Sequence, residues 1–168
     1  MKAKLIVEGK EFDIEIQDPE LQKLVSPKKT GYERVKTGGY YYIVATTNTT
    51  SCEDCHDEID DELYQLANYY SDLTVAKNNA RADKLMRQLR RFAVERREFT
   101  DSSRTSLKNE RWLIKYDLVD NKFEVVQSLS GVVTLGMPWF NSERCAQAAI
   151  DRFRDELIWY FTEYKDSL

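Results

Sequence analysis

The sequence predicts an α+β fold, in which an N-terminal β-hairpin and a short helix precede two repeated units, each made of a strand meander and a long helix. Three observations support this prediction. Apolar and polar residues alternate before residue 17, two later segments carry apolar residues every three or four positions, and the entries to these two segments match each other. At 168 residues the chain is long enough to bury a sizeable core.

Residues 1–25 are expected to form the hairpin and the short helix. Apolar residues fall on a period of two on either side of Glu8-Gly9-Lys10, which is typical of a β-hairpin. These apolar residues are Leu5, Val7, Phe12, Ile14 and Ile16. Asp18-Pro19 favours a helix start, because Asp can cap a helix and Pro fits its first position. Residues 26–38 are rich in Lys, Gly and Pro and are expected to form a basic linker.

Residues 39–168 are expected to form a duplicated body, with units at 39–97 and 109–165. The elements expected in the first unit are a strand at 40–44, a polar turn region at 46–51, an acidic loop and a helix from about 71 to 97. The elements expected in the second unit are strands at 112–116, 123–127 and 132–135 and a helix from about 141 to 164.

The entries to the two long helices match position by position. An aromatic residue precedes the cap in both, Tyr70 in the first and Phe140 in the second, and Ala76 and Ala146 follow at the same offset. An aromatic residue before the cap can pack against the helix entry, and a small residue lets the helix lie close to the sheet. This match indicates that one unit is a copy of the other.

The last helix is expected to leave aromatic area uncovered near the end of the sequence. Its stripe at Phe153, Leu157 and Phe161 should face the core, whereas Trp159 lies about 200° from Leu157 at 100° per residue. We therefore expect Trp159 and Tyr160 to form an interface, either between two copies of the chain in a homodimer or with a target protein. The alternative is that the N-terminal hairpin packs over Trp159.

Composition and motifs exclude several classes of function. The chain has 25 Lys and Arg against 29 Asp and Glu, a net charge of −4. No apolar run approaches the roughly 20 residues of a membrane span, and no export signal is evident, so we expect a cytoplasmic protein without membrane contact. The nucleophile elbow, the phosphate loop and the dinucleotide-binding motif are missing. We expect no catalytic residues and no cofactor, and a metal-dependent enzyme ranks third among the functions considered.

The three cysteines limit the redox and metal chemistry. Cys52-Glu53-Asp54-Cys55-His56 matches the haem-attachment pattern C-x-x-C-H and could form half of a zinc site, but a second ligand pair of suitable spacing is missing. Cys145 lies apart in a helical pattern. The carboxylates that follow Cys55 should raise the thiol pKa values. We expect reduced thiols in a polar loop with no bound metal.

Charge segregation is the strongest functional signal. Seven carboxylates without an intervening Lys or Arg form a predicted acidic loop, made of Glu53, Asp54, Asp57, Glu58, Asp60, Asp61 and Glu62. The loop is expected to bind a protein partner and to imitate a phosphate backbone if that partner binds nucleic acid. Reversing Asp57, Asp60 and Asp61 to Lys should abolish binding and spare stability, because exposed ion pairs are worth about 0–1 kcal/mol. The alternative is a solvated loop without a partner.

A second interface is suggested by the basic half of the first long helix. Its basic residues are Arg81, Lys84, Arg87, Arg90, Arg91, Arg96 and Arg97. They could contact nucleic acid through phosphate charges. This alternative ranks lower than a protein partner, because the chain is acidic overall and carries no groove-reading motif.

Four segments of the sequence are distinctive as patterns, namely Gly31–Val35, Asn68–Asp72, Ala80–Phe92 and Asp155–Tyr164. These segments resemble a set of small accessory proteins encoded by phages and prophages of Gram-positive bacteria. Such sequences often carry Gly before the Asn, and the Ala67 found here argues against a tight turn at that position.

The resemblance covers most of residues 30–168, and it implies a genome context rather than a set of functional residues. Accessory proteins of this size and context often inhibit host defence proteins, including CRISPR nucleases. The resemblance therefore implies a non-enzymatic binding protein, comparable to an anti-CRISPR protein, whose partner is a host protein such as a nucleic-acid-binding defence nuclease.

Overall fold

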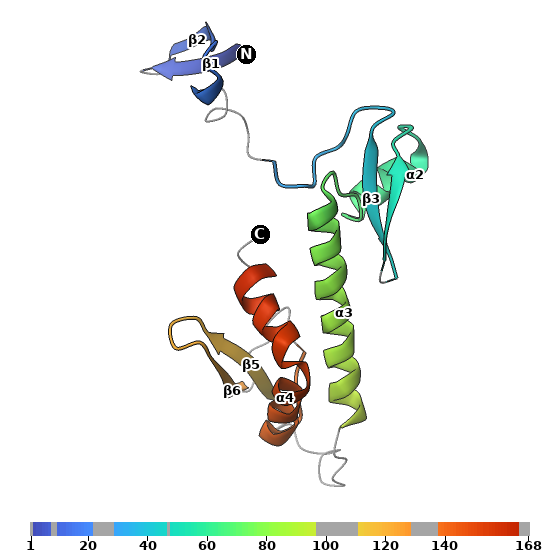
Figure 1. Cartoon of the computed structure of the whole chain (residues 1–168), viewed down its shortest axis with the longest axis vertical. Helices are drawn as coiled ribbons and strands as arrows, with labels where there is room; N and C mark the ends of the chain where they lie inside the picture. The colour runs from blue at the N-terminus through green and yellow to red at the C-terminus, as the bar shows by residue number, and fades with distance from the viewer. Residues whose placement is uncertain are drawn as a thin grey trace.

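The computed structural model describes residues 2–7, 10–21, 29–46, 48–96, 111–128 and 138–164. It confirms the mixed α+β class, because antiparallel strand pairs and helices alternate along the chain within these ranges (Figure 1). The strands of the described part form three separate two-stranded sheets. Packing between helices and hairpins, rather than one continuous sheet, therefore holds the body together.

The predicted N-terminal hairpin is present. It consists of β1 (Lys2–Val7) and β2 (Lys10–Glu15), which pair antiparallel. Beyond it, Asp18 Oδ1 accepts a hydrogen bond from the Glu20 amide at 2.8 Å, and residues 19–21 are helical. The remainder of the predicted short helix lies outside the described residues.

The hairpin of the first unit consists of β3 (Tyr40–Ala45) and β4 (Asn48–Glu53). The first strand agrees with the prediction. The polar turn region predicted at 46–51 is wrong, because most of that range belongs to strand β4. Thr50 is β-branched and pairs with Ile43 across the hairpin, so the segment has the residues that an antiparallel strand favours.

The second half of the predicted acidic loop is helical and belongs to α2 (Glu58–Gln65). Asp57 is its N-cap, and the Asp57 side chain accepts hydrogen bonds from the amides of Ile59 and Asp60. The Asp60 side chain accepts from the Asp57 amide in return, which completes a capping box. The loop prediction is wrong because carboxylates at the start of a helix satisfy its free amides and favour its positive end.

The remaining elements are α3 (Leu73–Glu95), β5 (Arg111–Asp117), β6 (Lys122–Ser128), α4 (Glu143–Trp159) and the π-helix η2 (Tyr160–Tyr164). The two long helices thus lie close to their predicted bounds. The strand predicted at 132–135 lies outside the described residues.

Each of the two long helices is preceded by an isolated antiparallel bridge to a strand. Tyr42 pairs with Tyr70 and Trp112 pairs with Phe140 as isolated antiparallel bridges, so the partners are 28 residues apart in both units. Each bridge ends two residues before the N-cap of a long helix and ties that helix to the first strand of its hairpin. Among the described residues, the second unit has no counterpart of α2.

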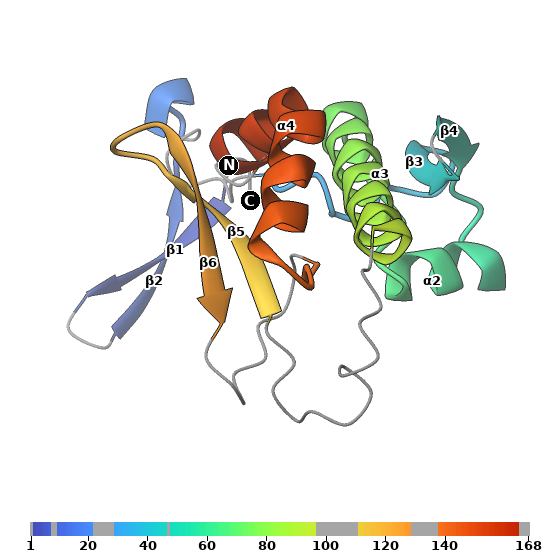
Figure 2. The same ribbon diagram turned by 90° about the horizontal axis from the view of Figure 1, so that it is seen from below.

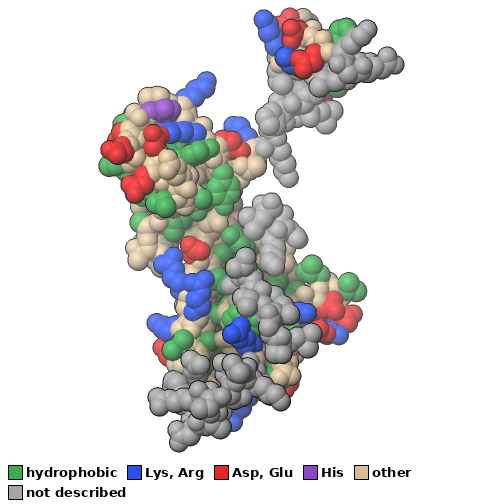
Figure 3. Space-filling model, turned by 180° about the vertical axis from the view of Figure 1, so that it is seen from behind, with side chains coloured by type: hydrophobic (Ala, Val, Ile, Leu, Met, Phe, Trp, Pro, Cys, Tyr) green, Lys and Arg blue, Asp and Glu red, His purple; other side chains and the backbone are tan. Residues whose placement is uncertain are grey.

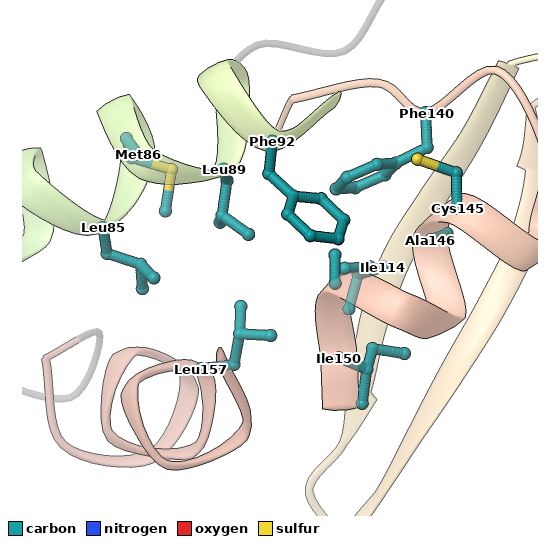
Figure 4. Packing of buried hydrophobic residues seen from close by; sticks show 11 residues of the cluster. Leu85, Met86, Leu89, Phe92, Ile114, Phe140, Cys145, Ala146, Ile150 and Leu157 are labelled. Atoms are coloured by element: carbon teal, nitrogen blue, oxygen red, sulfur yellow. The ribbon is translucent and has the colours of Figure 1, made fainter. Parts of the chain in front are cut away.

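A cluster of buried apolar side chains lies between α3, α4 and the β5–β6 hairpin (Figure 4). Leu85, Leu89 and Phe92 of α3 face Ile150 and Leu157 of α4, and each of these five side chains is at most 3% exposed. Two alanines of α4 are fully buried and let the helix lie close to its neighbours. Burial of each large side chain stabilises the fold by roughly 1.5–3 kcal/mol.

The prediction that Trp159 leaves aromatic area exposed is wrong. Only 6% of Trp159 is exposed, and the Arg81 guanidinium carbon lies 3.9 Å from the centroid of its ring. Arg81 Nε donates to Glu156 at 2.8 Å, which holds the cation over the ring. The alternative cover is also wrong, because α3 supplies this cation while the β1–β2 hairpin lies apart from α4 (Figure 1). Tyr160 is half-buried, with its ring centroid 5.3 Å from that of Tyr164.

Helix α2 ends in a tight turn at Ala67, where the sequence argued against one. Ala67 has a φ of 53°, its amide donates to the Tyr64 carbonyl at 3.1 Å, and the Asn68 amide donates to the Leu63 carbonyl at 3.0 Å. These two bonds form the helix-ending motif in which glycine is preferred. Because left-handed backbone is unfavourable for a residue with a Cβ atom, the turn is strained.

We expect Ala67→Gly to raise the free energy of unfolding by about 1 kcal/mol, because glycine adopts this φ without a steric penalty. Urea denaturation followed by circular dichroism measures the change. As a control, Ala148→Gly within α4 should lower the same free energy by about 1 kcal/mol. A destabilised Ala67→Gly variant would contradict the strained turn.

Candidate protein-interaction surface

The seven carboxylates predicted as one binding loop separate into two groups. Asp54 and Asp60 are buried, with 0% and 4% of their surface exposed. The exposed members are Glu53 at the end of β4, Asp57 at the N-cap of α2, and Glu58, Asp61 and Glu62 on α2. The buried pair therefore acts inside the fold, and only the exposed group can meet a partner.

Asp54 follows β4 directly, and hydrogen-bond donors surround its carboxylate. The Tyr69 hydroxyl donates to it at 2.5 Å, the His56 amide at 2.8 Å and Arg34 Nε at 3.3 Å. His56 Nδ1 also lies 2.5 Å from Asp54 Oδ1. Burial raises the pKa of Asp54, but the donors outweigh burial and hold the pKa at about 2, below its ordinary 3.8. The carboxylate is therefore ionised at neutral pH.

Asp60, on the inner side of α2, is held in the same way. Its carboxylate accepts hydrogen bonds from the Tyr41 hydroxyl at 2.7 Å, the Cys55 amide at 2.8 Å and the Asp57 amide at 3.3 Å. The Tyr41 hydrogen bond is the largest cause that lowers the pKa of Asp60. These bonds tie the first turn of α2 to strand β3.

A stacked pair of tyrosines connects the two carboxylates. The rings of Tyr41 and Tyr69 are nearly parallel, with 3.9 Å between their centroids, and both residues are almost fully buried. Burial raises the pKa of Tyr69 to about 12, so its hydroxyl stays protonated and remains a donor to Asp54. We call the four residues Asp54, Asp60, Tyr41 and Tyr69 the Tyr–Asp network.

Arg34 links the Tyr–Asp network to the surface. Its Nε donates to buried Asp54, its other end pairs with exposed Asp61, and its guanidinium carbon lies 5.7 Å from the ring centroid of Tyr64. Part of the charge of Asp61 is thereby compensated within the fold. Glu58 and Glu62, by contrast, make no ion pair with any residue that the structure describes.

The outward side of α2 combines carboxylates with apolar side chains. At 100° per residue, Glu58, Ile59, Glu62 and Leu66 fall within about 100° of one another, on the side away from Asp60. Ile59 is 66% exposed and Leu66 is 67% exposed. We call these four residues the acidic face of α2. Figure 3 shows acidic side chains gathered over this end of the molecule.

The basic residues of α3 also differ in their surroundings. Arg81 pairs with Glu156 and covers Trp159, so it belongs to the contact between α3 and α4. Arg96 lies 5.0 Å from the ring centroid of Phe92. The members exposed on the outer side of α3 are Lys84, Arg87, Arg90 and Arg91. Arg97 lies outside the described residues.

His56, Cys52 and Cys55 differ in their contacts and in their exposure to solvent. His56 contacts Asp54, Cys52 is half-buried in β4, and Cys55 is exposed. Within the described ranges, no three His, Cys, Asp or Glu side chains gather in a way that could hold a metal ion. Burial and then the neighbouring carboxylates raise the pKa of the Cys55 thiol, in the direction that the sequence predicted.

The sequence reasoning missed the residues that organise this surface. The sequence analysis places Tyr41 in a strand and Arg34 in a linker, and it gives Tyr69 no role of its own, because it assigns the helix entry to Tyr70. The one available signal was the density of tyrosines at 40–42 and 69–70. That signal does not say which hydroxyl reaches which carboxylate.

Comparisons with protein-family models, with curated proteins and with solved structures find no match to this chain. The described helices include none that is both long and apolar enough to cross a bilayer. The function is therefore argued from the surface itself.

The structure contradicts the expectation that reversal of Asp57, Asp60 and Asp61 spares stability. Asp60→Lys should lower the free energy of unfolding by about 3 kcal/mol or more, because it buries a cation and leaves the Tyr41 hydroxyl and two amides unpaired. Glu62→Lys, on the exposed side of the same helix, should change it by about 0.5 kcal/mol or less. Urea denaturation of the two variants measures the contrast, and equal losses would contradict the assigned burial.

Acid should weaken the Tyr–Asp network in a defined range. Because the pKa of Asp54 is lowered to about 2 in the folded chain, its stabilising contribution is complete above the ordinary value near 4 and is lost as the pH falls toward 2. The wild type should therefore lose more stability between pH 5 and pH 2.5 than Asp54→Asn, which cannot ionise. Urea midpoints at the two pH values provide the comparison, and parallel losses would argue against a network with Asp54 ionised.

Proposed function

We propose that this chain is a non-enzymatic binding protein whose acidic face of α2 docks on a basic and partly apolar surface of another protein. The observation that carries the proposal is the exposure of Ile59 and Leu66 beside Glu58 and Glu62, on a helix whose opposite side is fixed by Asp60. Exposed apolar residues bordered by charge are typical of protein interfaces.

The chemistry of the surface supports a protein partner. Apolar contacts by Ile59 and Leu66 would supply affinity, while the carboxylates would attract a basic partner and orient it. The Tyr–Asp network supports the proposal further, because a helix held in one position loses little conformational entropy on binding.

The class of partner follows from the resemblance to phage-encoded accessory proteins. Defence nucleases bind nucleic acid and therefore carry basic surfaces. A helix face with carboxylates one turn apart can compete with phosphates for such a surface. We propose a bacterial defence protein of this class as the first partner to test.

Affinity capture from nuclease-treated bacterial lysate, followed by mass spectrometry, tests the proposal. The wild type should retain a specific protein, the retention should weaken as salt is added, and Glu58→Arg/Glu62→Arg should lose it. The matched control is Asp151→Arg/Asp155→Arg, which makes the same charge change at the same spacing on the exposed side of α4 and should retain the partner. A protein held equally by both variants would refute a role for α2.

The alternative of nucleic-acid binding keeps one supporting observation, the exposure of Arg87 and Arg90 on α3. Retention of the wild type on immobilised duplex DNA, lost in Arg87→Glu/Arg90→Glu and unchanged in Glu58→Arg/Glu62→Arg, would favour this alternative over the protein partner.

A further inference from the structure

One side of α3 changes its environment halfway along the helix. Ala76 and Ala80 are buried there, and the same side continues at alternating steps of four and three residues through Asp83, Arg87 and Arg90 to Val94. Exposed Asp83 pairs with Arg87 at 3.5 Å, so it compensates part of the charge of that arginine. Val94 is 70% exposed and both arginines are exposed. We call Arg87, Arg90 and Val94 the basic face of α3.

The first half of this side is covered by the β3–β4 hairpin. Both strands contact α3, and the core with α4 uses the other side of the helix, through residues such as Leu85 and Leu89. Figure 2 shows α4 with β5 and β6 on one side of α3 and β3, β4 and α2 on the other. The basic face is therefore an uncovered stretch of α3, and the β3–β4–α2 portion projects beside it from the same side of the helix.

The acidic face of α2 and the basic face of α3 complement each other in charge and in apolar character. Ile59 and Leu66 are exposed apolar residues, as is Val94. The two glutamates of the acidic face are opposite in charge to the two arginines of the basic face. Their lengths also agree, since α2 and the segment from Arg87 to Val94 each have eight residues and span about 12 Å at 1.5 Å per residue.

The two faces belong to different ends of one molecule. From the start of α3 at Leu73 to Arg90 the helix rises about 26 Å, and α2 lies beside its first turns (Figure 1). This separation exceeds the screening length of about 8–10 Å at physiological salt. The charges of the two faces therefore remain uncompensated by each other within one chain.

We propose that the acidic face of α2 binds the basic face of α3 in a second copy of this chain. The two α3 helices run antiparallel about a two-fold axis, so the contact between α2 of one copy and α3 of the other forms twice in the dimer. This inference rests on the proposed function, because it assigns a partner to the same α2 surface. A protein that binds the acidic face would compete with the dimer.

Sedimentation of the full-length chain tests the dimer. At low ionic strength the wild type should have twice the chain mass of 19.8 kDa, and at about 1 M salt, where the screening length is about 3 Å, it should have the mass of one chain. Glu58→Arg/Glu62→Arg and Arg87→Glu/Arg90→Glu should each be monomeric at low ionic strength. Their equimolar mixture should restore the dimer, because each reversed face then meets its complement. Circular dichroism melts verify that both variants are folded.

Three results would overturn the proposal: a wild type with the mass of one chain at low ionic strength, a dimer that survives either reversal, or a mixture that remains monomeric. Assemblies larger than two chains would overturn the two-fold arrangement. The control Asp151→Arg/Asp155→Arg should remain dimeric. Failure here is distinguishable from failure of the proposed function, because a monomeric wild type that captures a protein through Glu58 and Glu62 overturns the dimer alone.

Discussion

The burial of two carboxylates, Asp54 and Asp60, is the constraint on which the first unit depends. An ionised carboxylate removed from water is costly unless donors replace its hydration. Here the donors are tyrosine hydroxyls, backbone amides and one arginine, drawn from the linker, β3, the turn after β4 and the entry to α3. Satisfying the pair fixes these segments relative to one another. It also fixes which side of α2 faces outward.

The bridges that tie the two long helices to their hairpins lie in different chemical settings. In the second unit the bridge at Trp112 and Phe140 leads into an apolar cluster of Ile114, Ile150 and Leu157. In the first, the bridge at Tyr42 and Tyr70 adjoins the polar Tyr–Asp network. Close-packed apolar contacts stabilise the helices, while the network orients a charged surface.

The sequence predicted the elements whose signals are local, and it failed where the outcome depended on distant contacts. The long helices and the N-terminal hairpin follow from periodicity and caps. The acidic segment 53–62 was misassigned because charge alone does not separate Asp60, which accepts a buried tyrosine hydroxyl, from Glu62, which faces water. Trp159 was misassigned because the helical wheel of α4 does not reveal that Arg81, 78 residues earlier in the chain, lies over its ring.

Native-state hydrogen exchange tests most directly whether the Tyr–Asp network positions α2. In Tyr41→Phe, which keeps the stacked ring and removes only the hydroxyl bound to Asp60, the amides of α2 should exchange faster than in the wild type. The amides of α4 around Ile150 should keep their protection, because the apolar core is unchanged. Unchanged protection of α2, or an equal loss in α2 and α4, would contradict the account.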